Sequence, residues 1–175
     1  ERTGQTRLAA EYYDRALRLF SDHPDRLYRG GSVHLTLGQF DRAISYLEHA
    51  TTRIPGERAY HAQLIRAYTR DGQYKRAQEV TQTALQIGAE STDLWLAAGE
   101  LALQQEDYAA AEKAFVRVLA EQPGRMEARL MVARLRSVRG DYQAAIAAYT
   151  TAVADGLSIE DVVEPLAAAY IALGQ

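Results

Sequence analysis

The side chains that most often carry metal or acid–base chemistry are sparse in this chain. Its four histidines, His23, His34, His49 and His61, stand far apart in the sequence. Glu57 and His61 lie one helical turn apart, but because two ligands do not complete a metal site, we expect them to form a surface pair. There is no HExxH sequence, glycine-rich phosphate loop or GxSxG turn. We therefore expect no enzyme activity, no metal and no cofactor.

Composition excludes several further classes of function. The chain has no cysteine, which removes disulfides, thiolate metal sites and cysteine nucleophiles. Its net charge of −3 gives no general attraction for nucleic acid or anionic membranes, so we expect neither as a partner. No apolar run is long enough for membrane insertion, and the first residues do not resemble a signal peptide. Cytoplasm and bacterial periplasm both remain compatible with the sequence.

The charge is distributed unevenly along the chain. Residues 1–90 carry thirteen Lys and Arg against eleven Asp and Glu, and residues 91–175 carry seven against twelve. We expect the two halves to prefer different partners. Only Lys75 and Lys113 among the twenty basic residues are lysine, which weakly indicates a GC-rich, bacterial source.

The elements that position these side chains repeat every thirty-four residues. In each copy an aromatic residue follows a Gly or Glu by two positions, and an alanine follows the aromatic residue by three. The copies run over 38–43 (GQFDRA), 72–77 (GQYKRA), 106–111 (EDYAAA) and 140–145 (GDYQAA). A fixed period of this length indicates one supersecondary unit copied and stacked, with packing between neighbouring units rather than around one central core.

Each unit is expected to be a pair of helices joined by a short turn. Apolar residues at spacings of three and four, such as Leu94, Ala98 and Leu101, place one stripe on each helix. Glycine in the turn motif provides the conformational freedom needed where the first helix ends. Glu106 takes this place in the third unit, so that turn must close without glycine.

The period divides residues 1–175 into a single all-α array. We expect whole repeats at 24–57, 58–91, 92–125 and 126–159, a second helix of a partial repeat at 5–21, and a first helix of another at 160–175. In the first of these partial repeats Ala9, Tyr13 and Ala16 occupy the slots of Ala43, Leu47 and Ala50. Pro165 predicts that the last helix starts late or bends. Because solenoid units bury a face against the next unit, the array is expected to continue in a longer protein or to associate end to end.

These motifs resemble tetratricopeptide repeats, whose pattern is Trp-x-x-Leu-Gly-x-x-Tyr on the first helix and Ala, a large residue, Ala and Pro on and after the second. The third unit matches with Trp95, Gly99, Ala111, Phe115 and Pro123. The other units match at Gly31, Ala43, Leu47, Ala50 and Pro55, at Leu64, Tyr68, Ala77 and Ala84, and at Ala133, Ala145, Tyr149 and Ala152. The resemblance covers essentially the whole chain and implies a right-handed alpha-alpha superhelix, a solenoid of antiparallel helix pairs.

The fourth unit departs from this pattern. Arg129 and Arg136 occupy its Trp and Tyr positions, on a helix that also carries Arg134 and Arg139. We expect their aliphatic stems to cover the neighbouring helix, with the guanidinium groups in water or near Glu164. The alternative is a local basic patch for an acidic partner.

The resemblance also implies that the first helices line a concave groove that holds a peptide or a partner helix. Placing the register on that geometry gives the expected contact residues Tyr28, Arg29, Ser32, Gln63, Arg66, Arg70, Leu96, Glu100, Leu130, Met131 and Arg134. Arginine forks favour carboxylates, and the apolar members add buried area. We therefore expect a protein or peptide partner with both acidic and apolar side chains.

Two functions remain open at this point. The first is a non-catalytic protein–protein interaction module or scaffold. The second is a structural spacer in a longer array, as in bacterial envelope and polysaccharide-export proteins. One subclass of the family clamps the terminal carboxylate of chaperones with Lys and Asn, but those positions here hold Tyr28, Ser32, Gln63, Asp93 and Ala97, which excludes that specificity.

Overall fold

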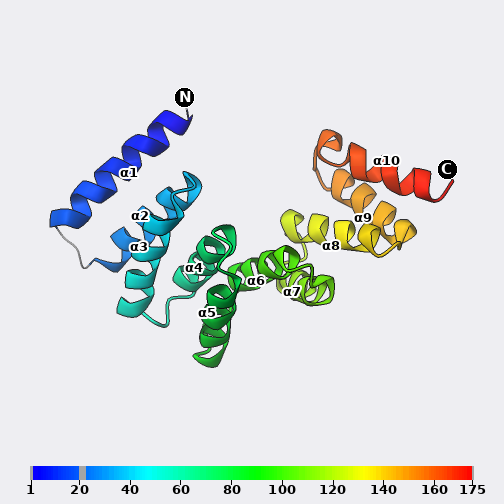
Figure 1. Ribbon diagram of the computed structural model, residues 1–175. Helices are drawn as coiled ribbons and strands as arrows, with labels where there is room; N and C mark the ends of the chain where they lie inside the picture. Colours follow the sequence, from blue (N-terminus) through cyan, green and yellow to red (C-terminus); the bar gives the residue numbers. More distant parts are fainter. Residues whose placement is uncertain (1, 20–22, 175) are drawn as a thin grey trace. The chain divides into compact units, whose positions relative to one another are not determined.

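The structure is a computed structural model that describes residues 2–19 and 23–174. Within these ranges it contains ten α-helices, one short 3-10 helix and no strand. The helices fall into two compact units, Glu1–Gln105 and Glu106–Gln175, which we describe one at a time (Figure 1). The predicted repeat boundaries remain a prediction, and their positions 1, 20, 21 and 175 lie outside the described residues.

The first unit is a succession of helices that pack on their neighbours in the chain. They are α1 (Arg2–Leu19), α2 (Pro24–Thr36), α3 (Phe40–Arg53), α4 (Arg58–Arg70), α5 (Tyr74–Gln86) and α6 (Thr92–Gln104). In addition to these sequential contacts, α4 contacts both α2 and α6. The helices α2, α4 and α6 are therefore adjacent elements, although a second helix separates each from the next along the sequence.

The core of the first unit follows the predicted helical spacing. Ala43, Leu47 and Ala50 on α3 are completely buried, and Leu64, Ile65 and Tyr68 on α4 pack in the same cluster as Ala43 and Leu47. Among the described side chains of α1, Ala10 and Leu17 are buried, whereas Ala9, Tyr13 and Ala16 are half-buried.

Gly31 allows α2 and α3 to approach closely. A Cβ atom at this position would lie 2.7 Å from Leu47 Cγ and 3.2 Å from the Ala43 carbonyl oxygen, both closer than ordinary packing allows. Ala43 and Leu47 belong to the motif that follows the turn, so the close approach joins the two halves of one predicted unit.

The turn after each first helix uses the left-handed backbone region. Gly38 and Gly72 have φ values of 71° and 79°, as expected for glycine at this point. Glu106 adopts φ 58° in the equivalent turn, so that turn closes in the same conformation without glycine. A residue with a Cβ atom pays a steric penalty in this conformation.

The second unit contains α7 (Tyr108–Glu121), α8 (Met126–Val138), α9 (Tyr142–Ala154), the 3-10 helix η1 (Ile159–Asp161) and α10 (Val163–Ala172). Contacts again join sequential helices, and α10 also contacts α8. Ala133, Ala145, Tyr149 and Val162 form its buried centre. The helix α10 begins only two residues before Pro165, because proline fits the first helical turn. None of the described helices is long and apolar enough to cross a membrane.

Candidate functional site

The predicted contact residues of the first unit lie on three adjacent helices. Tyr28, Arg29 and Ser32 are on α2, Gln63, Arg66 and Arg70 are on α4, and Leu96 and Glu100 are on α6. Because α4 contacts both α2 and α6, the fold brings the three groups onto neighbouring elements. Only part of this set remains available to a partner, because several members contact one another.

Arg66 and Glu100 form an ion pair across α4 and α6. The Arg66 Nε atom lies 3.2 Å from Glu100 Oε2, and the side chains are only 17% and 33% exposed. The two residues are thirty-four positions apart, so they occupy the same place in successive copies of the repeat. The charge of Arg66 is therefore compensated within the chain, and the pair joins two first helices.

Tyr28 is held in place by stacking between α2 and α4. Its ring packs on that of Tyr60 with the centroids 5.0 Å apart and an interplanar angle of 28°. The Tyr60 hydroxyl donates a hydrogen bond to Asp25 Oδ1 at 2.7 Å, and Ser32 Oγ donates to the Tyr28 carbonyl oxygen at 2.9 Å. Burial, together with the bond to Asp25, raises the pKa of Tyr60 well above its ordinary value.

The remaining contact residues of the first unit differ in accessibility. Arg29 and Arg70 are exposed, and in the described part of the chain neither makes an ion pair. Gln63 is half-buried, whereas Leu96 is 0% exposed, so the structure does not leave that side chain at the surface. Among the predicted polar contacts of this unit, Arg29, Gln63 and Arg70 thus form no side-chain hydrogen bond or ion pair with any described residue.

The other predicted contact residues belong to the second unit. Leu130, Met131 and Arg134 all lie on α8, where Leu130 packs against the buried centre of the unit, Met131 is half-buried and Arg134 is exposed. They share one helix.

A polar cluster that the sequence did not reveal joins α1, α2 and α3. The Asp14 carboxylate on α1 accepts hydrogen bonds from His34 Nε2 at 2.9 Å, from Arg42 Nη1 at 2.7 Å and from the Tyr46 hydroxyl at 2.8 Å. His34 is completely buried, and its Nδ1 atom lies 2.6 Å from Gln39 Oε1. One carboxylate therefore links three helices.

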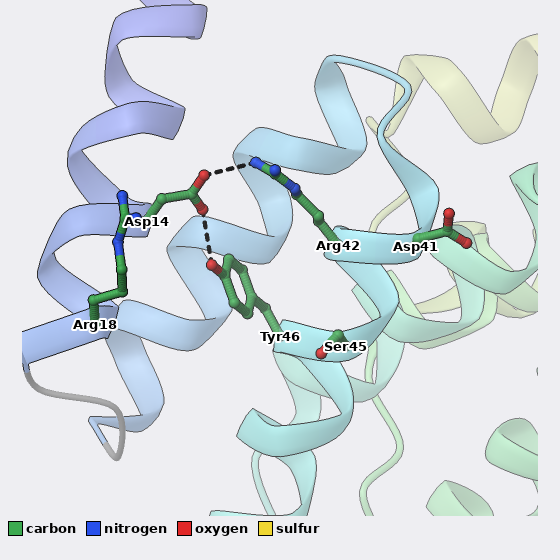
Figure 2. Close-up of a pocket in the computed structure, with 6 residues that line it drawn as sticks. All are labelled: Asp14, Arg18, Asp41, Arg42, Ser45 and Tyr46. Atoms are coloured by element: carbon green, nitrogen blue, oxygen red, sulfur yellow. Dashed lines mark hydrogen bonds and ion pairs between the residues drawn. The ribbon is translucent and has the colours of Figure 1, made fainter.

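Asp14, Arg42 and Tyr46 of this cluster line an open pocket of about 410 Å³ between α1 and α3 (Figure 2). Arg18 follows Asp14 by one turn of α1, while Asp41 points away from Asp14. The pocket carries two acidic and two basic side chains, so it does not favour a ligand of either charge. We assign the cluster to the cohesion of the first three helices.

The pKa values within this cluster follow from its hydrogen bonds. Burial raises the pKa of Asp14, but the bonds from Tyr46 and His34 and the charges of His34 and Arg42 outweigh that effect and lower it below 3.8. Burial and the hydrogen bond to Asp14 raise the pKa of Tyr46 to about 12. A charged carboxylate beside a protonated phenol is therefore the stable arrangement.

We expected the guanidinium groups of Arg129 and Arg136 in water or near Glu164, and in the described residues neither they nor Arg139 pair with Glu164. Arg129 pairs with Asp155 and donates from Nε to the Pro123 carbonyl oxygen at 2.7 Å. Arg139 pairs with Glu112 on α7. The acceptors thus lie in the turn before α8, at the end of α9 and on α7 rather than on α10. Arg136 makes no ion pair within the described residues.

The expected pairing of Glu57 with His61 is wrong. His61 is buried, and its Nε2 atom lies 2.6 Å from the Pro55 carbonyl oxygen, while the Glu57 carboxylate caps α4 at Ala59 N. Both side chains bond to backbone atoms at the N-terminal end of α4 instead of to each other. Among the described residues, no three His, Cys, Asp or Glu side chains gather in a way that could hold a metal ion.

Sequence reasoning missed the ion pair and the cluster for different reasons. The thirty-four residue period could have identified Arg66 and Glu100 as partners, because equal places in successive units lie side by side. The bond between Asp14 and His34 had no comparable signal, since the two residues are twenty positions apart and occupy different places in the repeat.

Comparison with known families identifies the repeat. One model of the tetratricopeptide repeat matches residues 1–58 and 96–158, and a second matches residues 34–101. Together they cover most of the chain. A comparison with curated proteins found no significant match.

Solved structures with this fold are similar along nearly the whole chain. A thermophilic tetratricopeptide repeat protein from Thermus thermophilus is 22% identical, with a TM-score of 0.80 over 97% of this chain and 92% of that one. MamA from Desulfovibrio magneticus RS-1 is 17% identical, with a TM-score of 0.68 over 87% and 86%. YrrB, described as having an unusual peptide-binding site, is 17% identical, with a TM-score of 0.67 over 93% and 84%. These similarities establish the helical solenoid fold.

Proposed function

The chain belongs to the tetratricopeptide repeat family, and on that basis we propose that it is a non-catalytic protein-interaction module. Its partner is a peptide or protein segment that lies along α2, α4 and α6 of the first unit. Repeats of this kind serve as scaffolds because adjacent helices present a continuous surface with many side chains.

The observation that carries this proposal is the pair of exposed, uncompensated arginines on adjacent first helices. Arg29 on α2 and Arg70 on α4 have no acidic partner in the described part of the chain, in contrast to Arg66, whose charge Glu100 balances. A guanidinium group can hold a carboxylate with two parallel hydrogen bonds. We therefore propose that Arg29 and Arg70 bind acidic side chains of the partner, with Gln63 as a further hydrogen-bonding group.

The apolar part of the partner is assigned to Tyr28. Its ring is half-buried and fixed by Tyr60, so little conformational entropy is lost when a side chain packs on it. Arg66 contributes indirectly, because its pair with Glu100 fixes the spacing of α4 and α6. YrrB, which has a similar fold, has a peptide-binding site of its own, which supports peptide binding as a use of this scaffold.

The test is affinity capture from an extract of the source organism, followed by calorimetry with the partner that mass spectrometry identifies. We expect the Arg29→Ala/Arg70→Ala double variant to bind that partner at least about tenfold more weakly, because two charge-assisted contacts are lost. Lys75→Ala, which removes an exposed charge from α5, is the matched control. Equal affinities of the double variant and the control would contradict the assignment.

A second candidate function is the structural spacer, and exposed apolar residues favour it. Leu8 and Tyr12 on α1 are 51% and 61% exposed, and Ile171 on α10 is 76% exposed. Apolar surface of this kind is suited to packing against a further helix or another copy of the chain. Light scattering tests this candidate: a monomer at all concentrations would argue against end-to-end packing, and a Tyr12→Lys variant should reduce any association observed.

A further inference from the structure

The arginines that replace the aromatic residues of the repeat pattern line a pocket in the second unit. The pocket has a volume of about 300 Å³ and is bounded by Leu119 on α7, by Arg129, Val132 and Arg136 on α8, and by Ala147, Ala148 and Thr151 on α9. These three helices follow one another in Figure 1 from green to orange. In the family pattern the places of Arg129 and Arg136 hold bulky Trp and Tyr rings.

The pocket has an apolar wall and one uncompensated charge. Leu119, Val132, Ala147 and Ala148 supply the wall. Arg129 is balanced by Asp155, so its charge is not available to a ligand. Arg136 is half-buried and makes no ion pair in the described ranges.

Two acidic side chains that share a second pocket with Arg136 do not neutralise its charge. Arg136 also borders a second pocket that contains Glu112 and Asp141. Glu112 pairs with Arg139, however, and the Asp141 carboxylate accepts the Ala144 backbone N–H as the cap of α9. Both carboxylates are therefore engaged, and Arg136 retains its hydrogen-bonding capacity.

This pocket lies on a different face of α8 from the predicted contact residues. Arg129, Val132 and Arg136 are spaced by three and four positions and share one helical face. Leu130 and Arg134 lie on the opposite side of the same helix, because each residue advances about 100° around the axis. Binding at the pocket is therefore separate from the proposed binding along α2, α4 and α6, and it does not rest on the proposed function.

We propose that this pocket is a docking site for a partner peptide in which an aliphatic side chain stands next to an aspartate or glutamate. The aliphatic side chain enters between Leu119, Val132 and Ala148, and the carboxylate pairs with the guanidinium group of Arg136. Charge complementarity selects this occupant, because Arg136 is the pocket's unbalanced charge. The volume lies at the lower end for ligand pockets and suits a side chain or two rather than a large cofactor.

The exposed surface beside the pocket supports an extended occupant. Val116 lies one turn before Leu119 on α7 and is 49% exposed. The apolar surface therefore continues past the pocket, where a neighbouring residue of the peptide can pack.

The proposal is tested with a synthetic peptide, acetyl-Gly-Ser-Leu-Asp-Ser-Gly-amide, added to the complete chain while backbone and arginine side-chain signals are followed by NMR. We expect shifts confined to α7, α8 and α9, including the Arg136 Nε–H signal. Peptides with Leu-Asn or Ser-Asp in place of Leu-Asp should bind at least about tenfold more weakly. No shifts at millimolar peptide, or equal binding of the Leu-Asn peptide, would overturn the proposal.

Variants of the chain separate the two parts of the site. Arg136→Ala removes the charge, and Ala147→Leu fills the pocket from an exposed position while leaving the charge. Both variants should bind the Leu-Asp peptide at least about tenfold more weakly than the wild type. Arg134→Ala removes another positive charge, on the opposite face of α8, and this variant should bind the peptide like the wild type.

Two further controls keep the result decisive. Thermal melts by circular dichroism establish that each variant is folded, and Arg136→Gln replaces Arg136→Ala if the alanine variant is not. Isocaproate, which carries the aliphatic group and the carboxylate without a peptide, tests the alternative of a small-molecule site. Tighter binding of isocaproate than of the peptide would overturn the peptide assignment, as would wild-type affinity in the Arg136 variant.

Discussion

The Asp14 carboxylate gives the first three helices a shared polar connection. Three donors from α2 and α3 converge on it, and one of them belongs to His34, which is completely buried. Loss of the carboxylate would leave a buried imidazole nitrogen with no charged acceptor, and such groups are costly to leave unsatisfied. At the residue scale, Asp14 is therefore a structural residue rather than a ligand-binding one.

We predict that Asp14→Asn lowers the free energy of unfolding by about 2 kcal/mol at neutral pH. Because the pKa of Asp14 in the folded state is lowered below 3.8, its contribution is complete above that value and is lost as the pH falls through the folded-state pKa. The difference between variant and wild type should therefore shrink below about pH 4 in urea titrations. Asp41→Asn, which alters the carboxylate that points away from the cluster, should show no such trend.

We predict that the free energy of unfolding falls at alkaline pH, because three tyrosine hydroxyls have raised pKa values in the folded state. Tyr46, Tyr60 and Tyr68 donate to Asp14, Asp25 and Glu48, and burial followed by these bonds raises the pKa of each hydroxyl. For Tyr46 and Tyr68 the pKa rises from 10.0 to about 12. The folded state then holds protons that the unfolded state releases, so stability is complete below about pH 10 and falls as the pH rises above it.

Urea denaturation at a series of alkaline pH values measures this effect. Tyr46→Phe should make the alkaline decline shallower, because one of the three raised hydroxyls is removed. Phenolate absorbance of the native protein provides an independent check. Titration of all the tyrosines near the ordinary value of 10.0 would contradict the prediction.

At the scale of the helices, the close packing of α2 on α3 depends on a glycine, Gly31. Gly31 lets α2 approach α3 so closely that a Cβ atom would lie 2.7 Å from Leu47 Cγ. We predict that Gly31→Ala lowers the free energy of unfolding by about 1–3 kcal/mol, the usual cost of overpacking. Gly4→Ala is the control, since a Cβ atom there meets nothing within 4 Å and alanine favours the helix. Equal stability of the two variants would show that α2 can move away from α3.

The turn between α6 and α7 contains a glutamate, Glu106, in the left-handed backbone region. Glu106 adopts φ 58° where the equivalent turns contain glycine. We predict that Glu106→Gly raises the free energy of unfolding by about 1 kcal/mol, because glycine has no steric penalty in this region. Gly72→Ala, at φ 79°, should change stability by a similar amount in the opposite direction. Urea denaturation measures the free energy of unfolding of both variants. A Glu106→Gly variant less stable than the wild type would show that the glutamate side chain has a role in the turn.

At the scale of the whole molecule, the two proposed binding surfaces belong to different units. The arginines Arg29 and Arg70 lie in the first unit, and the pocket around Arg136 lies in the second. A solenoid transmits packing mainly between neighbouring repeats, so surfaces in repeats that are not neighbours along the chain are expected to act independently. We predict that the Arg29→Ala/Arg70→Ala variant binds the Leu-Asp peptide with wild-type affinity in the NMR titration. A lower affinity of this variant for the peptide would indicate that the two surfaces are coupled, directly or indirectly.

The sequence by itself determined the helical solenoid, because a period of thirty-four residues and the spacing of Ala43, Leu47 and Ala50 leave few ways to bury the apolar stripes. It also indicated that Glu106 must close a turn without glycine and that Arg129 and Arg136 depart from the pattern. These features are local, or they recur at the period of the repeat, so one chain contains enough information to identify them.

Only the tertiary structure decided which polar groups remain free. Arg66 is compensated by Glu100, Leu96 is buried and His61 bonds to a backbone carbonyl, whereas Arg136, beside an apolar pocket, makes no ion pair with any described residue. Ion pairs depend on distances of a few ångströms between side chains from different helices, and helical periodicity does not specify those distances. The repeat therefore gave the candidate positions, and the packing of neighbouring helices separated the structural charges from those available to a partner.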